Sequence, residues 1–329
     1  MELLLDISLL SMLVATAVGI ALSRDLLAAV MLSSIYGLLS ANFFVNMDAV
    51  DVAFTEASVG AGISPLLMFA TLAIVGRHER YPHQRALAAL LLVALTGALL
   101  ILATFDMPAF GAVDAPAQTH VAPRYINDSY SEIGIPNIVT SVLASYRGFD
   151  TFGEVVVVFA AAVGVLSLLT VSQSASSRVP EHLLKASHHK ILRVVSKVLI
   201  APILLFALYV QFHGDYGPGG GFQAGVIFAA AIIVYTMLFG LEAARQVINV
   251  TVVRILAAVG VLLYGSVGVV AMLNGKNFLD YDALAHDPLH GQHYGIIVIE
   301  LGVGITVAAV MILIYFSFAG RLIDRSPDA

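Results

Sequence analysis

Long apolar runs, separated by short polar segments, follow one another along the whole chain. A run of about 18 or more apolar residues indicates a transmembrane helix, because about 20 helical residues cross the hydrocarbon core of a bilayer. Nine runs meet this criterion, so the sequence predicts an all-α, polytopic integral membrane protein. Their expected bounds are 4–22, 26–45, 52–75, 86–104, 153–171, 192–212, 221–241, 251–273 and 294–318.

The composition narrows the function further. Of the 329 residues, 59% are hydrophobic and 12% are charged, whereas a soluble domain carries about 25% charged residues. This excludes a disordered chain, a nucleic-acid binder and an ordinary soluble enzyme. The chain contains no cysteine, which also excludes disulfides, thiolate metal sites and a cysteine nucleophile.

Lysine and arginine predict the orientation of the spans, because basic loops stay in the cytoplasm. If the loop that begins at Gly76 is cytoplasmic, 13 of the 16 basic residues lie on the cytoplasmic side. Only Arg124, Arg147 and Lys276 then lie outside. We therefore expect an external amino terminus and a cytoplasmic carboxyl terminus.

Two long loops organise the chain. The loop 106–152 is expected to be external, and its segment 138–146 to lie at the membrane surface. The loop 172–191 is rich in serine and histidine and is interpreted as a cytoplasmic linker. It divides the chain into a five-helix region, residues 1–171, and a four-helix region, residues 192–329. The two regions share no visible repeat, so an inverted-repeat transporter is not supported.

Acidic residues inside the spans are the main candidates for function, because burying a charge in a bilayer is costly unless it is paired or hydrated. Glu56 lies in the third span beside Thr55 and five residues after Asp51. One interpretation is an acid stabilised by the helix amino terminus, with Asp51 as the cap. The alternative is a hydrated path, which the nearby hydroxyls and small residues suit.

Glu154 opens the fifth span. Thr151 and Glu154 have the spacing of a capping box, so a structural role and a proton-carrying role both remain open. Arg147 and Asp150 precede this span and are expected to pair with each other or with another chain.

Glu300 lies about 9 Å into the last predicted span. Gly304 follows four residues later, on the same helix face. A carboxylate at this depth must be protonated, paired or wetted. Ion or proton handling and an interhelical hydrogen bond are the two interpretations.

A glycine-rich segment, HGDYGPGGGFQAG at residues 213–225, joins the sixth and seventh spans. It lacks the lysine of a nucleotide-binding loop and is interpreted as a tight re-entrant turn between packed helices, with His213 and Asp215 as a polar entrance. The other histidines, at 188–189 and at 286, 290 and 293, are interpreted as loop residues, because no carboxylate pattern beside them makes a metal site.

The segment 213–225 and the sequence Glu300-Leu-Gly-Val-Gly resemble the B-type subunit (MnhB/MrpB family) of the Mrp-type multisubunit sodium/proton antiporters. The segments that begin at Arg24 and Asp51, the segment Asn137–Thr140 and the segment Tyr146–Glu154 resemble the carboxyl-terminal tail of the large A-type subunit of the same assemblies. Similar pieces occur as small membrane subunits of membrane-bound hydrogenases. The chain therefore resembles a fusion of the A-type tail with a B-type subunit.

This resemblance implies a non-enzymatic membrane subunit of a monovalent cation (Na+)/proton antiporter in a bacterial inner membrane, contributing to pH homeostasis. It implies partner subunits of the A, C, D, E, F and G types, Na+ and H+ as transported ions, the lipid bilayer as surroundings, and no cofactor or nucleic acid. Glu56 and Glu154 become candidates for a cation path and Glu300 for a proton or cation relay. The supporting residues are Asp51, Thr55, Arg147, Asp150, His213 and Asp215, and the structural loop is Pro218, Gly219, Gly220 and Gly221.

Two alternatives remain. The chain is either a membrane subunit of a respiratory or hydrogenase-type complex that couples redox chemistry to ion transfer, or a scaffold that moves no ions. Redox subunits encoded nearby would favour the first alternative. A scaffold should tolerate neutralisation of all three glutamates.

Overall fold

The protein is helical throughout the part of the chain that the structure describes. The computed structural model describes residues 2–79, 83–109, 111–169 and 190–324. Within these ranges, nine helices are long and apolar enough to cross a membrane, which confirms the fold class predicted from the hydrophobic pattern. Apart from residues 190 and 191, the expected linker 172–191 lies outside the described residues.

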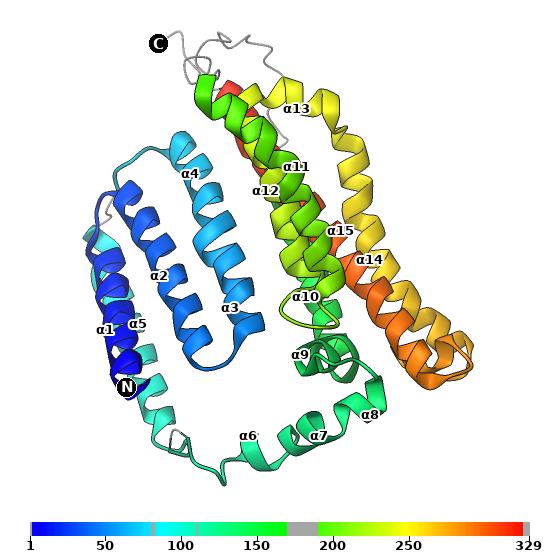
Figure 1. Cartoon of the computed structure of the whole chain (residues 1–329). Coiled ribbons are helices and arrows are strands. Elements are labelled where there is room, and N and C mark those ends of the chain that lie inside the picture. The colour runs from blue at the N-terminus through cyan, green and yellow to red at the C-terminus, as the bar shows by residue number, and fades with distance from the viewer. Residues whose placement is uncertain (1, 80–82, 110, 170–189, 325–329) are drawn as a thin grey trace.

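The helices form two groups (Figure 1). The first consists of α1 (Glu2–Leu22), α2 (Leu26–Asn46), α3 (Val50–Glu56), η1 (Ala57–Ile63), α4 (Ser64–Val75) and α5 (His83–Thr104). The second consists of α10 (Gly148–Leu169), α11 (Lys190–His213), α12 (Gly221–Phe239), α14 (Val250–Leu273) and α15 (Pro288–Asp324). The helix α3, the π-helical η1 and α4 continue one another as a single span, Val50–Val75.

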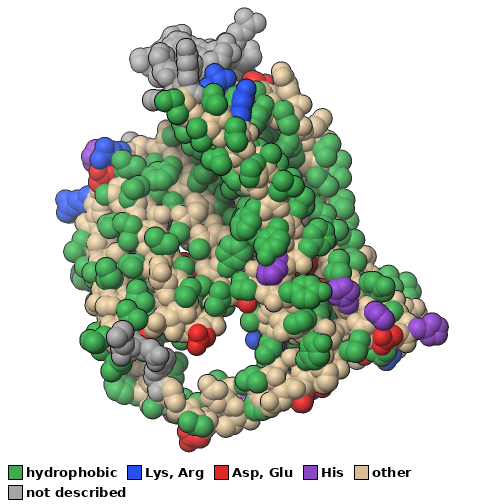
Figure 2. Space-filling view, viewed as in Figure 1, with side chains coloured by type: hydrophobic (Ala, Val, Ile, Leu, Met, Phe, Trp, Pro, Cys, Tyr) green, Lys and Arg blue, Asp and Glu red, His purple; other side chains and the backbone are tan. Residues whose placement is uncertain are grey.

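Short helices mark the two ends of the molecule. At one end lie α6 (Pro116–Thr119), α7 (Ala122–Asn127), α8 (Ser129–Ile133), α9 (Ile138–Thr140), the π-helical η2 (Ser141–Tyr146) and the 3-10 helix η4 (Tyr281–Leu284). At the opposite end, α13 (Leu241–Val247) crosses from α12 to α14 (Figure 1). On the face shown in Figure 2, most Lys and Arg side chains lie toward the α13 end, and most Asp, Glu and His side chains lie toward the other end. The positive-inside rule predicts this distribution if the α13 end is cytoplasmic.

Small residues bring the helices of the second group close together around α15. Gly221 and Gly225 stand four residues apart on α12, where a Cβ on Gly225 would lie 2.7 Å from the Gly304 carbonyl oxygen. On the other side of α15, a Cβ on Gly302 would lie 2.7 Å from the Gly260 carbonyl oxygen of α14. Small residues at this spacing let transmembrane backbones approach directly. The helix α15 is therefore the buried centre of the second group.

The helix α5 is packed very differently. Its leucine and isoleucine side chains are exposed on all sides, including Leu90–Val93 and Leu99–Leu102, each at least 58% exposed. A helix that is apolar all round and unburied by its own chain is stable only in an apolar environment. Its surface agrees with a membrane location.

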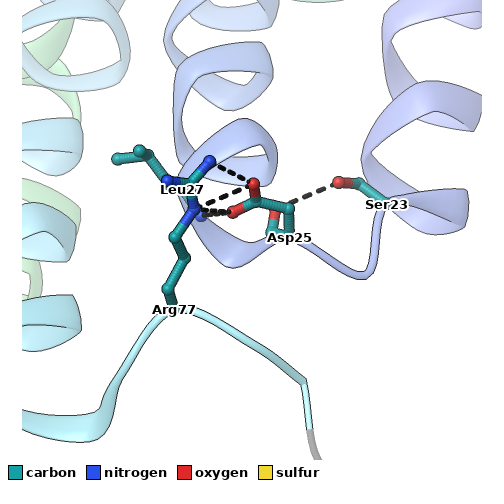
Figure 3. Close-up of polar contacts among 4 residues, drawn as sticks. All are labelled: Ser23, Asp25, Leu27 and Arg77. Atoms are coloured by element: carbon teal, nitrogen blue, oxygen red, sulfur yellow. Dashed lines mark hydrogen bonds and ion pairs between the residues drawn. The ribbon is translucent and has the colours of Figure 1, made fainter.

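An ion pair joins the first turn to the end of the third span (Figure 3). The Asp25 carboxylate accepts a hydrogen bond from the Leu27 backbone N–H at 3.0 Å and caps α2. The Arg77 guanidinium donates to both oxygens of the same carboxylate, at 2.6–3.0 Å. This hydrogen bonding lowers the pKa of Asp25 from 3.8 to about 2. The pair therefore holds α2 and α4 in register from pH values well below neutral.

Two local expectations from the sequence are wrong. Helix α10 begins at Gly148, so Thr151 lies inside the helix and donates its hydroxyl to the Leu143 carbonyl at 2.8 Å, not to a capping box. Helix α3 begins after Ala49, so Asp51 is in its first turn and is not its cap. The segment 138–146 is helical, and Thr140, Ser141 and Ala144 on it are buried against the rest of the protein.

Candidate ion and proton site

A glycine loop, residues 214–220, joins α11 to α12 and forms the centre of the candidate site. Gly220 has a φ of +112°, in the region that favours glycine. Its backbone N–H donates to the Val210 carbonyl at 3.0 Å, which folds the loop back onto α11. A Cβ on Gly214 would lie 3.0 Å from the Gly220 Cα, so the two ends of the loop touch through their backbones.

Two polar residues of the long loop hold the glycine loop in place. The Asn137 amide donates to the carbonyls of Gly214 and Gly217, each at 3.1 Å, and to the Asp51 carboxylate at 3.3 Å. The Thr140 hydroxyl donates to the Gly214 carbonyl at 2.7 Å. Asn137 also caps α9, because its side-chain oxygen accepts a hydrogen bond from the Val139 backbone N–H. The long loop thus connects the glycine loop to α3 of the first helix group.

Glu300 lies where α12 begins. A Cβ on Gly221, the first residue of α12, would meet the Glu300 carbonyl, and Cβ atoms on Gly214 or Gly220 would lie 3.2 Å from its carboxylate oxygen Oε1. The carboxylate is therefore surrounded by glycine backbone. It has no hydrogen-bond or ion-pair partner among the described residues.

Two cavities meet at Glu300. One, of about 250 Å³, contains the polar side chains of Asp51, Thr55, Thr140, Thr151, Glu154, Gln223 and Glu300. The other, of about 220 Å³, is lined by Gln211, Phe212, Asp215, Tyr216, His293, Ile297 and Glu300. Within the described part of the chain, Glu300 is the one residue that lines both. The site therefore consists of two cavities, each with both polar and apolar side chains in its walls, and a carboxylate between them.

The second cavity contains an ion pair. The Asp215 carboxylate lies 3.2 Å from Nδ1 of His293, and the carboxylate is largely buried. Burial raises the pKa of Asp215, and the nearby His293 imidazole partly opposes this rise when it is protonated. Asp215 thus changes its charge at a higher pH than an exposed aspartate does.

The structure brings only some of the predicted residues together. Glu154 lines the first cavity with Asp51 and Thr55, and its carboxylate has no partner among the described residues. Glu56 lines neither cavity, and its carboxylate folds back over Gly60 in η1. A Cβ on Gly37 of α2 would lie 2.6 Å from the Gly60 backbone, so Glu56 lies beside this close helix contact.

The remaining predicted residues lie around the cavities. His213 stacks on Tyr209, with ring centroids 4.9 Å apart, and lines neither cavity. Arg147 and Asp150 pair with each other on the surface, Nε to Oδ2 at 2.6 Å. Gly219, Gly220 and Gly221 line the first cavity, and Pro218 lies beside them in the glycine loop.

Four residues of the site, Asn137, Thr140, Gln223 and His293, were given no role in it from the sequence. Asn137, Thr140 and Gln223 make hydrogen bonds across more than 70 residues of sequence, and no local pattern announces such contacts. Gln223 donates to the Thr55 hydroxyl at 2.7 Å. His293 was interpreted as a loop residue, but it lies on α15, which begins at Pro288. Its spacing of seven residues from Glu300, two helical turns, could have revealed it.

The comparisons with known protein families divide the chain into three parts. Residues 191–313 match a domain related to the MnhB subunit of Na+/H+ antiporters. Residues 11–77 match MbhD, the D-type subunit of MBH, and residues 85–183 match MbhE, its E-type subunit. A Staphylococcus aureus (strain Newman) protein described as an antiporter subunit, mnhB2, is 34% identical over 133 residues, which are 40% of this chain and 94% of that protein.

Two solved structures are similar in fold. A chain of the Mrp complex from Dietzia sp. DQ12-45-1b matches 98% of this chain with a TM-score of 0.77 and 24% identity. This chain spans 35% of the length of that Mrp chain. A chain of the membrane-bound sulfane sulfur reductase, an archaeal respiratory membrane complex, matches 72% of this chain with a TM-score of 0.55 and 27% identity, over 98% of its own length.

Proposed function

The chain belongs, through residues 191–313, to the family of domains related to the MnhB subunit of Na+/H+ antiporters, and from this we propose that it is a membrane subunit of a multisubunit monovalent cation/proton antiporter. It contributes to the ion and proton path and performs no covalent chemistry. Its partners are subunits of the A, C, D, E, F and G types in a bacterial inner membrane. The amino terminus is external, and the linker 172–191 separates a region like the A-type tail from a B-type region.

The observation that carries this proposal is the position of Glu300 between two cavities that each contain further ionisable side chains. A carboxylate without a partner is costly within a bilayer, and such a group is retained where it handles ions or protons. Glu154 and Asp51 line the same cavity, and Glu56 lies one helical turn further along the third span. We assign Glu300 to the relay and Glu56 and Glu154 to a cation path.

Neutralising the three glutamates tests the proposal against a pure scaffold. Glu56→Gln, Glu154→Gln and Glu300→Gln are combined in the assembled complex, and sodium-driven proton movement is measured in everted vesicles. The triple variant should assemble and lose most of the exchange. Glu242→Gln is the matched control, because this glutamate lies on the surface of α13 and pairs, among the residues that the structure describes, only with Arg245 at 3.3 Å. Wild-type exchange in an assembled triple variant would establish the scaffold.

The likeness to an archaeal respiratory complex supports one other candidate, a subunit that couples redox chemistry to ion transfer. An imposed sodium gradient discriminates between the two. Proton movement in vesicles that receive sodium but no electron donor identifies an antiporter. Proton movement that starts only with an electron donor identifies the redox-coupled complex.

A further inference from the structure

The two cavities lie along one stripe of α15. His293 and Ile297 line the cavity on one side of Glu300, and Val303 and Val307 line the cavity on the other. These positions recur every three or four residues, so they share one helix face. His293 and Val307 are each seven residues from Glu300, or about 10 Å along the axis. Glu300 therefore separates two stacked chambers on one face of a helix.

Backbone atoms occupy the space beside the Glu300 carboxylate. Gly214 and Gly220 touch each other, and a methyl group on either one would already lie 3.2 Å from Oε1 of Glu300. An ion larger than a proton would have to lose its water and displace the glycine loop to pass this point. The loop is fixed by the hydrogen bonds of Asn137 and Thr140.

The nearby backbone carbonyl oxygens already accept hydrogen bonds. A sodium ion that loses its hydration shell needs several oxygens in its place, as ions do in filters lined by carbonyls. The Gly214 carbonyl accepts two hydrogen bonds, from Asn137 and Thr140, and the Gly217 carbonyl accepts one from Asn137. The Asp51 carboxylate accepts from the same amide. The two carbonyl oxygens are therefore paired with donors and do not form a ring of free carbonyls around a cation.

A proton needs neither the space of a sodium ion nor a shell of several oxygens. It binds a carboxylate oxygen of Glu300 from one chamber and leaves that carboxyl group into the other, so only an O–H bond forms and breaks. We infer that Glu300 is a proton-selective connection between the two cavities, and that sodium does not pass through this point. This inference rests on the proposed function and assigns its proton branch to this chain.

The test separates proton movement from sodium movement in vesicles that contain the assembled complex. A pH-sensitive dye reports proton movement driven by a sodium gradient. Radioactive sodium, at equal pH and equal sodium concentration on both sides, reports sodium-for-sodium exchange. Glu300→Gln should lower sodium-driven proton movement by about tenfold or more and leave sodium-for-sodium exchange at the wild-type rate. The control Glu242→Gln should leave both unchanged.

The results that overturn the inference differ from those that overturn the proposed function. Loss of both activities in assembled Glu300→Gln would mean that sodium also uses this carboxylate, and retention of proton movement would mean that protons bypass it. If the complex with Glu300→Gln does not assemble, the Glu300→Asp variant tests the inference instead. It should shift the pH profile of proton movement without changing the KM for sodium. A changed KM for sodium would refute the inference. Wild-type vesicles in which sodium drives no proton movement would instead refute the proposed function.

Discussion

Replacing Asn137 with alanine should loosen the connection between the two helix groups. The substitution removes the cap of α9 and the amide donor that holds the glycine loop and the Asp51 carboxylate. A lost helix cap costs about 1 kcal/mol, and each neutral hydrogen bond contributes about 1 kcal/mol net. The Gly214 carbonyl keeps its hydrogen bond from Thr140. Two acceptors, the Gly217 carbonyl and the Asp51 carboxylate, therefore lose the hydrogen bond from the Asn137 amide. We expect a loss of about 3 kcal/mol in unfolding free energy.

Thermal unfolding of the purified protein in detergent measures this loss. At about 2 °C per kcal/mol for a large domain, the midpoint should fall by about 6 °C. Asn42→Ala is the matched control, because that exposed amide makes a single bond within α2, to the Leu38 carbonyl at 2.8 Å. An Asn137→Ala variant that unfolds at the same temperature as Asn42→Ala would refute this account of how the loop is held.

Asn137→Asp provides a second check on the same contact. Aspartate keeps the cap of α9, because it still offers a side-chain oxygen. It also places a second carboxylate where the amide now lies, 3.3 Å from the Asp51 carboxylate. Like charges at this distance repel strongly. The variant should be least stable at neutral pH and should recover as the pH falls and one carboxylate takes up a proton. Equal destabilisation at all pH values would show that repulsion is not the cause.

Three further predictions concern orientation, packing and the ion pair at Asp25. The chain has no cysteine of its own, so Thr119→Cys should react with an impermeant maleimide from outside intact cells, and Gln246→Cys should react only after permeabilisation. Gly225→Val should lower the unfolding midpoint, because overpacking of the α12–α15 contact costs about 1–3 kcal/mol. Arg77→Gln should destabilise the protein at pH 6 but not near pH 2. The lowered pKa of Asp25 keeps its favourable charge above the ordinary value of 3.8, and the contribution is lost as the pH falls to about 2.

Each of these three predictions has a control or a result that would contradict it. Labelling of Gln246→Cys from outside would reverse the predicted orientation. Gly97→Ala is the packing control, since a Cβ on Gly97 meets nothing within 4 Å, and it should leave the midpoint unchanged or raise it. An Arg77→Gln effect that persists unchanged near pH 2 would show that the Asp25 charge is not its source.

The spans could be predicted from the sequence because a bilayer leaves little choice. Every backbone polar group in hydrocarbon must be bonded within its own segment, so a long apolar run becomes a helix. The ends of the helices were less predictable, because polar and aromatic residues continue a helix beyond its apolar run. Helix α15 starts at Pro288, six residues before the predicted apolar run, and η4 packs against α15. The capping box at Thr151 failed for the same reason, since the helix already begins at Gly148.

Of the residues in the site, mainly the charged ones could be predicted from the sequence. Glu154, Glu300 and Asp51 stand out in the sequence because carboxylates are rare in apolar surroundings, and the structure places all three on one cavity. Glu56 stands out equally, yet it lies over Gly60 and lines neither cavity. The polar residues that bond across the fold, such as Asn137 and Gln223, carry no local signal, because their partners are distant in sequence.

The three parts recognised in the chain have a physical reason to be joined. Asp51 and Thr55 come from the part that matches MbhD, Thr140 and Glu154 from the part that matches MbhE, and Glu300 from the MnhB-related part. The cavity beside Glu300 is complete only when all three parts are present. The side-chain amide of Asn137, in the part that matches MbhE, donates hydrogen bonds to the Asp51 carboxylate in the first part and to the glycine loop in the third part. A single chain keeps these three parts in equal numbers and holds them together around the cavity, whereas separate chains must find one another by assembly.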